Sequence, residues 1–111
     1  MALKKPLEKD IQRACLEYLQ IMYGADRVWR NASGAMPCVR HGVTRFFKFG
    51  RKGAADISGI VPPTGRRLEV EVKREGQQLR PEQEIFLGMI REAGGIGICV
   101  HSVDELIAHG L

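Results

Sequence analysis

The sequence has no long apolar run and no paired cysteine spacing. No stretch approaches the length that crosses a membrane, and the first ten residues lack the apolar segment of a signal peptide. The three cysteines, Cys15, Cys38 and Cys99, are an odd number at unrelated positions, and free thiols fit a reducing compartment. We therefore expect a cytoplasmic protein without membrane contact.

Zinc ligands, repeats and linkers are missing as well. Cys38 and His41 have the spacing of one ligand pair, but no second pair completes the set, so we expect no structural zinc. The hydrophobic fraction of 44% and the charged fraction of 27% are ordinary for a globular protein, which argues against wholesale disorder. A chain of this length forms one domain with a real core, and we assign residues 1–111 to it.

Acidic residues are absent between Asp26 and Asp56. Residues 1–52 carry a charge of +7 (11 basic and 4 acidic), whereas residues 53–111 carry −3 (6 basic and 9 acidic). A basic half beside an acidic pocket suits a polyanion held against metal ions, although a merely soluble basic surface has the same composition. Our candidates for contact with DNA phosphates are Arg30, Arg40, Arg45, Lys48, Arg51, Lys52, Arg74 and Arg80.

The stretch 66–73 alternates apolar with charged residues, which predicts a half-buried strand. Its charged face carries Glu69, Glu71 and Lys73. The apolar segment 57–61 precedes it, and the turn Pro62-Pro63-Thr64-Gly65 returns the chain antiparallel. Such a hairpin brings Asp56 towards Glu71 and Lys73.

Two carboxylates and a lysine that converge in this way are typical of a metal site for phosphate chemistry. Mg²⁺ prefers oxygen ligands, so Asp56 and Glu71 are candidate ligands, together with the carbonyl of Val72. Lys73 is a candidate for orienting the attacking water or for contacting the scissile phosphate. Glu69 shares that face, either as a supporting group or as a solvated residue.

Further elements are predicted from the spacing of apolar residues and from Gly, Pro and helix-capping residues. They are a helix over 7–22, a short strand within 26–31, a loop over 32–37, a strand or projecting flap over 43–49, a helix that begins near Pro81 with the apolar stripe Ile85, Phe86, Met89 and Ile90, a buried strand over 96–100, and a short last helix after a capping box at 102–105. The fold class is α/β.

Gly53-x-x-Asp56 followed by Glu71-x-Lys73 resembles the PD-(D/E)XK nuclease superfamily. The acidic first turn at Glu8 and the Arg-Pro-Glu-Gln run at 80–83 resemble its VRR-NUC branch more specifically. The resemblance spans residues 8–100 and implies a restriction-endonuclease-like α-β-β-β-α-β core with a central mixed sheet between helices.

The resemblance also implies roles for single residues. It assigns metal binding to Asp56 and Glu71, catalysis to Lys73, completion of the metal site to Glu8, and a supporting role on the second helix to Gln83. A serine commonly precedes Pro-Glu-Gln in this branch; Arg80 stands there instead, which loses an N-cap of about 1 kcal/mol and offers a phosphate contact.

The implied activity is Mg²⁺- or Mn²⁺-dependent hydrolysis of DNA to 5′-phosphate and 3′-hydroxyl ends. Stand-alone members occur in phages and bacteria, so the location would be the host cytoplasm for a phage protein. They resemble Holliday-junction resolvases in being small homodimers that act on branched DNA. The alternatives are a flap or nicking endonuclease for other branched DNA, a DNA-binding module with a dead site, and a structural adaptor.

Overall fold

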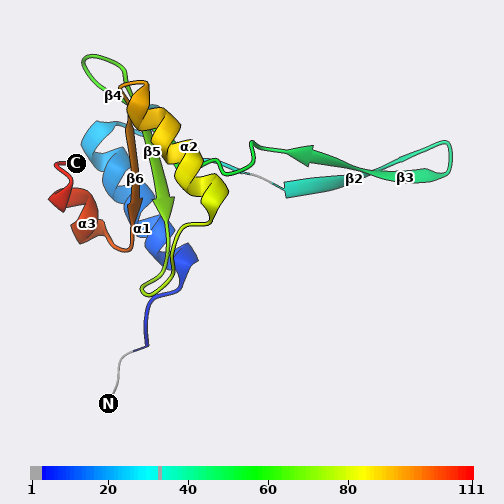
Figure 1. Ribbon diagram of the computed structural model, residues 1–111, viewed down its shortest axis with the longest axis horizontal. Coiled ribbons are helices and arrows are strands. Elements are labelled where there is room, and N and C mark those ends of the chain that lie inside the picture. The colour runs from blue at the N-terminus through cyan, green and yellow to red at the C-terminus, as the bar shows by residue number, and fades with distance from the viewer. Residues whose placement is uncertain (1–3, 33) are drawn as a thin grey trace.

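The computed structural model describes residues 4–32 and 34–111, apart from the side chains of residues 34 and 47–49. Figure 1 shows a mixed sheet between helices, with one hairpin that projects from it. This arrangement confirms the expected α/β class with a restriction-endonuclease-like core. The elements are α1 (Glu8–Tyr23), β1 (Val28–Arg30), β2 (Gly34–Arg40), β3 (Val43–Phe49), β4 (Ile57–Val61), β5 (Arg66–Val72), α2 (Pro81–Glu92), β6 (Ile96–Val100) and α3 (Val103–Ala108).

The central sheet has the strand order β1-β4-β5-β6. β1, β4 and β5 pair antiparallel, whereas β5 and β6 pair parallel because α2 forms the crossover between them. Buried residues of α1, such as Cys15 and Leu19, pack with Leu68, Val70 and Val72 of β5 in the main core. α2 covers the opposite face of the sheet with a smaller cluster around Phe86 and Leu87.

β5 is buried on both faces from Leu68 to Lys73, so the expectation of a half-buried strand was wrong. The charged side chains lie beneath α2, with only 2% of Glu71 and 8% of Lys73 exposed. The predicted stripe of α2 was also partly wrong. Ile85 and Met89 are exposed, and Gln83 is buried in their place, because the helix turns a polar side chain towards the acidic strand.

The predicted loop over 32–37 was wrong from Gly34 on, since Gly34–Arg40 form β2, which pairs antiparallel with β3; residue 33 lies outside the described residues. Pro37 lies within this strand. A proline lacks the N–H group that a central strand needs, but β2 has β3 as its one neighbour, and an edge strand tolerates proline. His41 (φ 53°) and Gly42 (φ 74°) close the hairpin, and two successive positive φ angles are what a type I′ turn requires.

We call this β2–β3 hairpin (34–49) the arm. It stands away from the rest of the molecule (Figure 1), so the flap alternative for 43–49 describes it well. The radius of gyration is 16.1 Å, whereas a compact chain of about 100 residues has about 13 Å. Among the described residues, no helix combines the length and the apolar character needed to cross a membrane.

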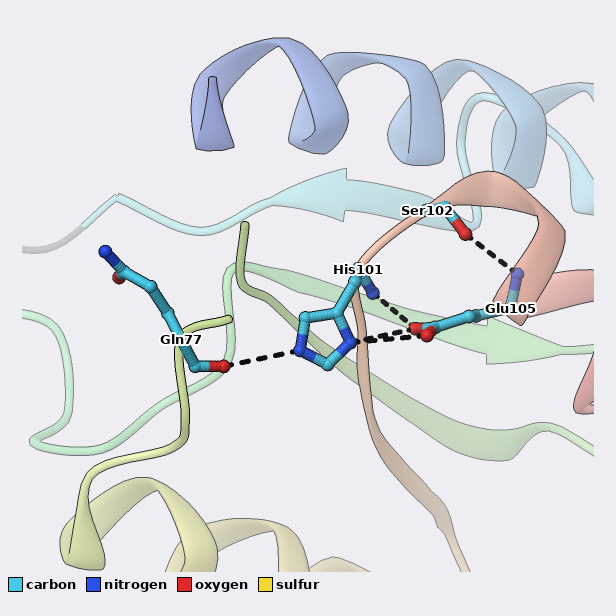
Figure 2. A network of polar contacts seen from close by, with 4 residues as sticks. All are labelled: Gln77, His101, Ser102 and Glu105. Atoms are coloured by element: carbon cyan, nitrogen blue, oxygen red, sulfur yellow. Dashed lines mark hydrogen bonds and ion pairs between the residues drawn. The ribbon is translucent and has the colours of Figure 1, made fainter. Parts of the chain in front are cut away.

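A polar network ties α3 to the loop that follows β5 (Figure 2). His101 Nδ1 lies 3.1 Å from Glu105 Oε2, and its Nε2 lies 3.3 Å from the carbonyl oxygen of Gln77. Ser102 Oγ accepts the N–H of Glu105 at 3.3 Å, which is half of the predicted capping box. The Glu105 carboxylate accepts the N–H of His101 rather than that of Ser102. The network holds the loop that begins directly after Lys73.

Gly53 sets how closely α2 approaches the segment before Asp56. Its φ is +79°, and an added Cβ would lie 2.3 Å from the carbonyl oxygen of Glu82. Gly76 has a similar φ of +87° but open space around it. Gly76→Ala should cost roughly 1–2 kcal/mol of unfolding free energy, because it tests the positive φ alone. Gly53→Ala should cost clearly more, because the added Cβ also meets the Glu82 carbonyl. Equal urea-unfolding free energies for the two variants would contradict the close packing.

Candidate functional site

The candidate site begins where β4 and β5 separate. The last backbone pair between the two strands is Ile57 with Val70. Asp56, which precedes Ile57, contacts β5 through its side chain instead of its backbone. Asp56 Oδ2 accepts the backbone N–H of Val72 at 2.8 Å. Since the N–H and C=O of one strand residue point to the same edge, the Val72 carbonyl also points towards Asp56. That this carbonyl is a metal ligand stays a prediction.

Three carboxylates converge at this point from three separate elements. Glu8 lies in the first turn of α1, Asp56 directly precedes β4, and Glu71 lies on β5. One oxygen of each lies within 4.8 Å of the other two, and within the described residues they are the one group of acidic, histidine or cysteine side chains placed to hold a metal ion. The structure thus brings the predicted acidic residues together.

Gln83 orients Glu71 from α2. Its Nε2 donates to Glu71 Oε1 at 3.1 Å, while its Oε1 accepts the backbone N–H of Arg80 at 2.9 Å. The second contact caps the start of α2 from the third helical position, which offsets part of the missing serine cap. Gln83 therefore couples the start of the helix to the acidic cluster, and both of its polar atoms are committed.

Glu71 is electrostatically strained. Its Oε2 is buried and faces no hydrogen-bond donor among the described residues. Burial, and next the neighbouring Asp56 carboxylate, raise the pKa of Glu71 to about 8, with a further increase from Glu8; Lys73 opposes the rise. A buried carboxylate that lies beside two other carboxylates and has one unpaired oxygen is a strong acceptor for a proton or a cation.

Lys73 follows Glu71 on the same face of the strand, so its ammonium group acts on the same cluster. The residue is 8% exposed, and its charge lowers the pKa of Glu71. Its backbone N–H donates to the Val100 carbonyl at 3.0 Å, which fixes the end of β5 against β6. The three predicted residues Asp56, Glu71 and Lys73 therefore lie in one place.

The comparisons with known proteins agree with this geometry. The family model described as the VRR-NUC domain matches residues 8–104. The chain belongs to the VRR-NUC family. This family is one of nucleases, and the match covers every acidic residue of the cluster, as well as Lys73 and Gln83. A search of curated proteins and a search of solved structures returned no match.

The candidate DNA-contacting residues of this VRR-NUC chain come from several elements. Arg40 and Arg45 lie on the arm, and the side chain of Lys48 lies outside the described residues. The others are Arg30 on β1, Arg51 and Lys52 between the arm and β4, Arg74 after β5, and Arg80 at the start of α2. Arg51 stacks over the ring of Phe86 at 5.4 Å, and Arg80 pairs with Glu82 at 3.5 Å.

Sequence reasoning missed three polar residues beside the VRR-NUC acidic cluster. Ser58 Oγ donates to Glu69 Oε2 at 2.6 Å, Arg67 Nη2 lies 2.6 Å from Glu69 Oε1, and Asn31 Nδ2 donates to Ser58 Oγ at 2.5 Å. Ser58 within an otherwise apolar strand was the available signal, because the turn at 62–65 places it opposite Glu69.

The raised pKa of Glu71 has a consequence for metal-free protein. Between about pH 4.5, where the unfolded residue ionises, and about pH 8, the folded state binds the extra proton, so stability falls as the pH rises through this window. In chelator, the unfolding temperature of wild type should decline across this window, and Glu71→Gln should flatten the decline. Glu75→Gln, which alters an exposed carboxylate, serves as the control. Parallel curves for wild type and Glu71→Gln would contradict the shift.

Proposed function

We propose that this chain is a metal-dependent endodeoxyribonuclease that cuts branched DNA. The observation that carries the proposal is the convergence of Glu8, Asp56 and Glu71 beside Lys73, with one buried oxygen of Glu71 facing no donor among the described residues. Three carboxylates at this spacing repel one another unless a proton or a cation lies between them. Family membership supplies the reaction class, since VRR-NUC proteins are nucleases.

The donor set fits Mg²⁺ or Mn²⁺. Carboxylate and carbonyl oxygens suit these hard cations, and the cluster offers neither the sulfur nor the imidazole that zinc and copper favour. We propose that Glu8, Asp56, Glu71 and the Val72 carbonyl hold the ion. When bound, the cation supplies Lewis-acid stabilisation of the phosphoryl oxygens and lowers the pKa of a water molecule.

The side chains of the chain supply position and charge. Lys73 offers a point charge for a non-bridging oxygen of the scissile phosphate or for the attacking water, and its burial restricts the conformers available to it. Gln83 keeps Glu71 Oε1 engaged, which leaves Oε2 without a hydrogen-bond partner among the described residues. The water oxygen bonds to phosphorus, the bond to the 3′ oxygen breaks, and that oxygen takes up a proton, which leaves 5′-phosphate and 3′-hydroxyl ends.

The arm favours a homodimer that presents two sites to a four-way junction. Towards the tip of the arm, the cross-strand pairs Pro37–Phe46 and Val39–Thr44 share one face, and we call these four residues the uncharged face; the pair Ala35–Lys48 follows them in the same alternation, nearer the sheet. About two thirds of Val39 and Phe46 is exposed (69% and 68%). A two-stranded hairpin with such a face is marginal in water by itself, and a second copy of the arm would cover it.

The opposite face of the arm suits DNA. Cys38 pairs with Arg45 and Arg40 pairs with Val43, and these four residues form what we call the basic face. Together with His41 they line a hollow of about 320 Å³. Guanidinium groups beside small apolar side chains can grip a phosphate backbone. One arm would thus serve both contacts, one on each face.

The first test compares substrates. Purified protein, given end-labelled four-way junction, flap, duplex and single-stranded DNA, should cut the junction in Mg²⁺ or Mn²⁺ and cut nothing in chelator. Asp56→Asn and Lys73→Ala should lower cleavage at least 100-fold, since each removes charge stabilisation in the transition state, while DNA binding is retained. Preferential cutting of flaps would replace the junction assignment.

Calorimetry with Mn²⁺ separates an active site from a dead one. If Mn²⁺ binding to the wild type releases or absorbs heat and this heat disappears in Asp56→Asn, the metal site is supported. If the wild type does not bind Mn²⁺, the protein is a DNA-binding module without a nuclease site.

The two faces of the arm provide controls for each other. Arg40→Gln/Arg45→Gln should weaken DNA binding and reduce the salt slope by about two, with the molar mass in light scattering unchanged. Val39→Ser/Phe46→Ser should halve the molar mass to that of the 12.4 kDa chain. A wild type that is already monomeric, or a serine variant that stays dimeric, would contradict the assignment of the uncharged face.

A further inference from the structure

A cavity of about 220 Å³ opens beside Asp56, at the root of the arm, and the proposed chemistry does not use it. Its floor holds Ser58 and Glu69, each 1% exposed. Its polar lining is Asn31, Arg51, Asp56, Ser58, Arg67 and Glu69. Asp56 belongs both to this cavity and to the acidic cluster, so whatever enters the cavity lies next to the proposed metal site.

Glu69 fixes Arg67 at this cavity. Its Oε1 accepts from Arg67 Nε at 2.8 Å and lies 2.6 Å from Arg67 Nη2, while its Oε2 accepts from Ser58 Oγ at 2.6 Å. A buried ion pair adds little net stability over an apolar pair of similar size. A fully buried carboxylate at this strand position is therefore better explained by the orientation it gives to the half-exposed guanidinium.

Arg67 retains donors for a ligand. A guanidinium has five N–H groups, and Glu69 engages only its Nε and Nη2 atoms. Arg51 adds a second guanidinium to the lining, held over Phe86 at 5.4 Å. By contrast, the carboxylate and the hydroxyl of the floor are already paired. Among the side chains of the lining, the donors that remain belong to Arg67 and Arg51, whose Nη2 also donates to Met89 Sδ at 3.6 Å. Two guanidinium groups favour an anion over a neutral group, and the Asp56 carboxylate of the same lining limits the anion to the side of the two arginines.

Asn31 connects the cavity to the metal site. Its backbone N–H donates to the Asp56 carbonyl at 2.8 Å, and its Nδ2 donates to the Ala55 carbonyl at 3.0 Å as well as to Ser58 Oγ. The cavity wall and the backbone that carries Asp56 are thus one hydrogen-bonded unit. A group in the cavity keeps a constant position relative to a group at the acidic cluster.

We infer that this cavity is a subsite for one backbone phosphate of the DNA strand, adjacent to the scissile phosphate. The inference rests on the proposed nuclease function and extends it: Arg67, positioned by Glu69, and Arg51 receive the phosphate. Occupation of both places sets which bond along the strand lies over Asp56 and Glu71. Arg67 is a binding residue in this scheme, and Glu69 is a positioning residue.

The test removes one phosphate charge at a time. In the Lys73→Ala background, with Mg²⁺, affinity is measured for junctions in which a single neutral methylphosphonate is moved along the cleaved strand. One position next to the cut should weaken binding about 10-fold, as the loss of a charged hydrogen bond does. Adding Arg67→Gln/Glu69→Gln should reduce that sensitivity at least threefold, because it removes the Arg67 guanidinium and leaves Arg51 as the one arginine of the described lining. Changing both residues avoids a buried carboxylate without its cation. Adding Arg66→Gln, which alters an exposed neighbour bonded to Gly94, should preserve it.

The outcomes separate the two proposals. Junction binding with no methylphosphonate position that depends on Arg67 overturns the subsite and leaves the nuclease assignment standing. An abasic nucleotide that weakens binding where the methylphosphonate does not makes the cavity a base pocket and overturns the phosphate assignment. If Arg67→Gln/Glu69→Gln fails to fold by circular dichroism, Arg67→Lys carries the test, and it should lose part of the sensitivity. No DNA binding at all overturns both proposals.

Discussion

The hydrogen bond from the Val72 N–H to Asp56 is the contact on which the site depends. It replaces a backbone-to-backbone bond with a side-chain bond at the point where β4 leaves the sheet. The replacement aims the carboxylate across the strand towards Glu71 instead of into solvent. It also keeps the carbonyl edge of Val72 free of a strand partner from β4. The local break in pairing and the acidic cluster are thus one feature.

This arrangement costs stability, and the opposite face of the sheet offsets the cost. Burial and neighbouring charge hold the pKa of Glu71 near 8, so its ionised form is disfavoured in the metal-free fold. On the other face, Leu68, Val70 and Val72 are fully buried against α1, and burying each such side chain contributes about 1.5–3 kcal/mol. The alternation of β5 therefore divides one strand into a stabilising face and a face that can bear unfavourable charge.

The hairpin at the centre of the site could be predicted from the sequence because its information is local. The turn at 62–65 sets the register of β4 against β5, and that register brings Asp56 to Glu71. Glu8 and Gln83 could be predicted only through family resemblance, since their contribution depends on how α1 and α2 pack. The arm was missed at β2 because the strand signal of 34–40 is weak in isolation and its pairing partner lies across a two-residue turn.

The polar network beside the cluster could not be predicted for a different reason. Ser58 and Glu69 are cross-strand neighbours, so their contact follows from the register, but nothing local to Asn31 indicates that it closes the network. Asn31 comes into place because β1 pairs with β4, and that pairing joins segments about 27 residues apart. Local sequence patterns do not indicate which distant strands pair, so the position of Asn31 could not be predicted from them.

The position of Asn31 also explains why the arm and the site belong together. The chain passes from β1 to the arm through Asn31 and comes back from the arm through Ala55 to β4, and we call these two connections the roots of the arm. Asn31 joins these roots through its bonds to the carbonyls of Ala55 and Asp56. Because these two carbonyls belong to the backbone that carries the Asp56 side chain, the base of the arm and the acidic cluster share one hydrogen-bonded segment.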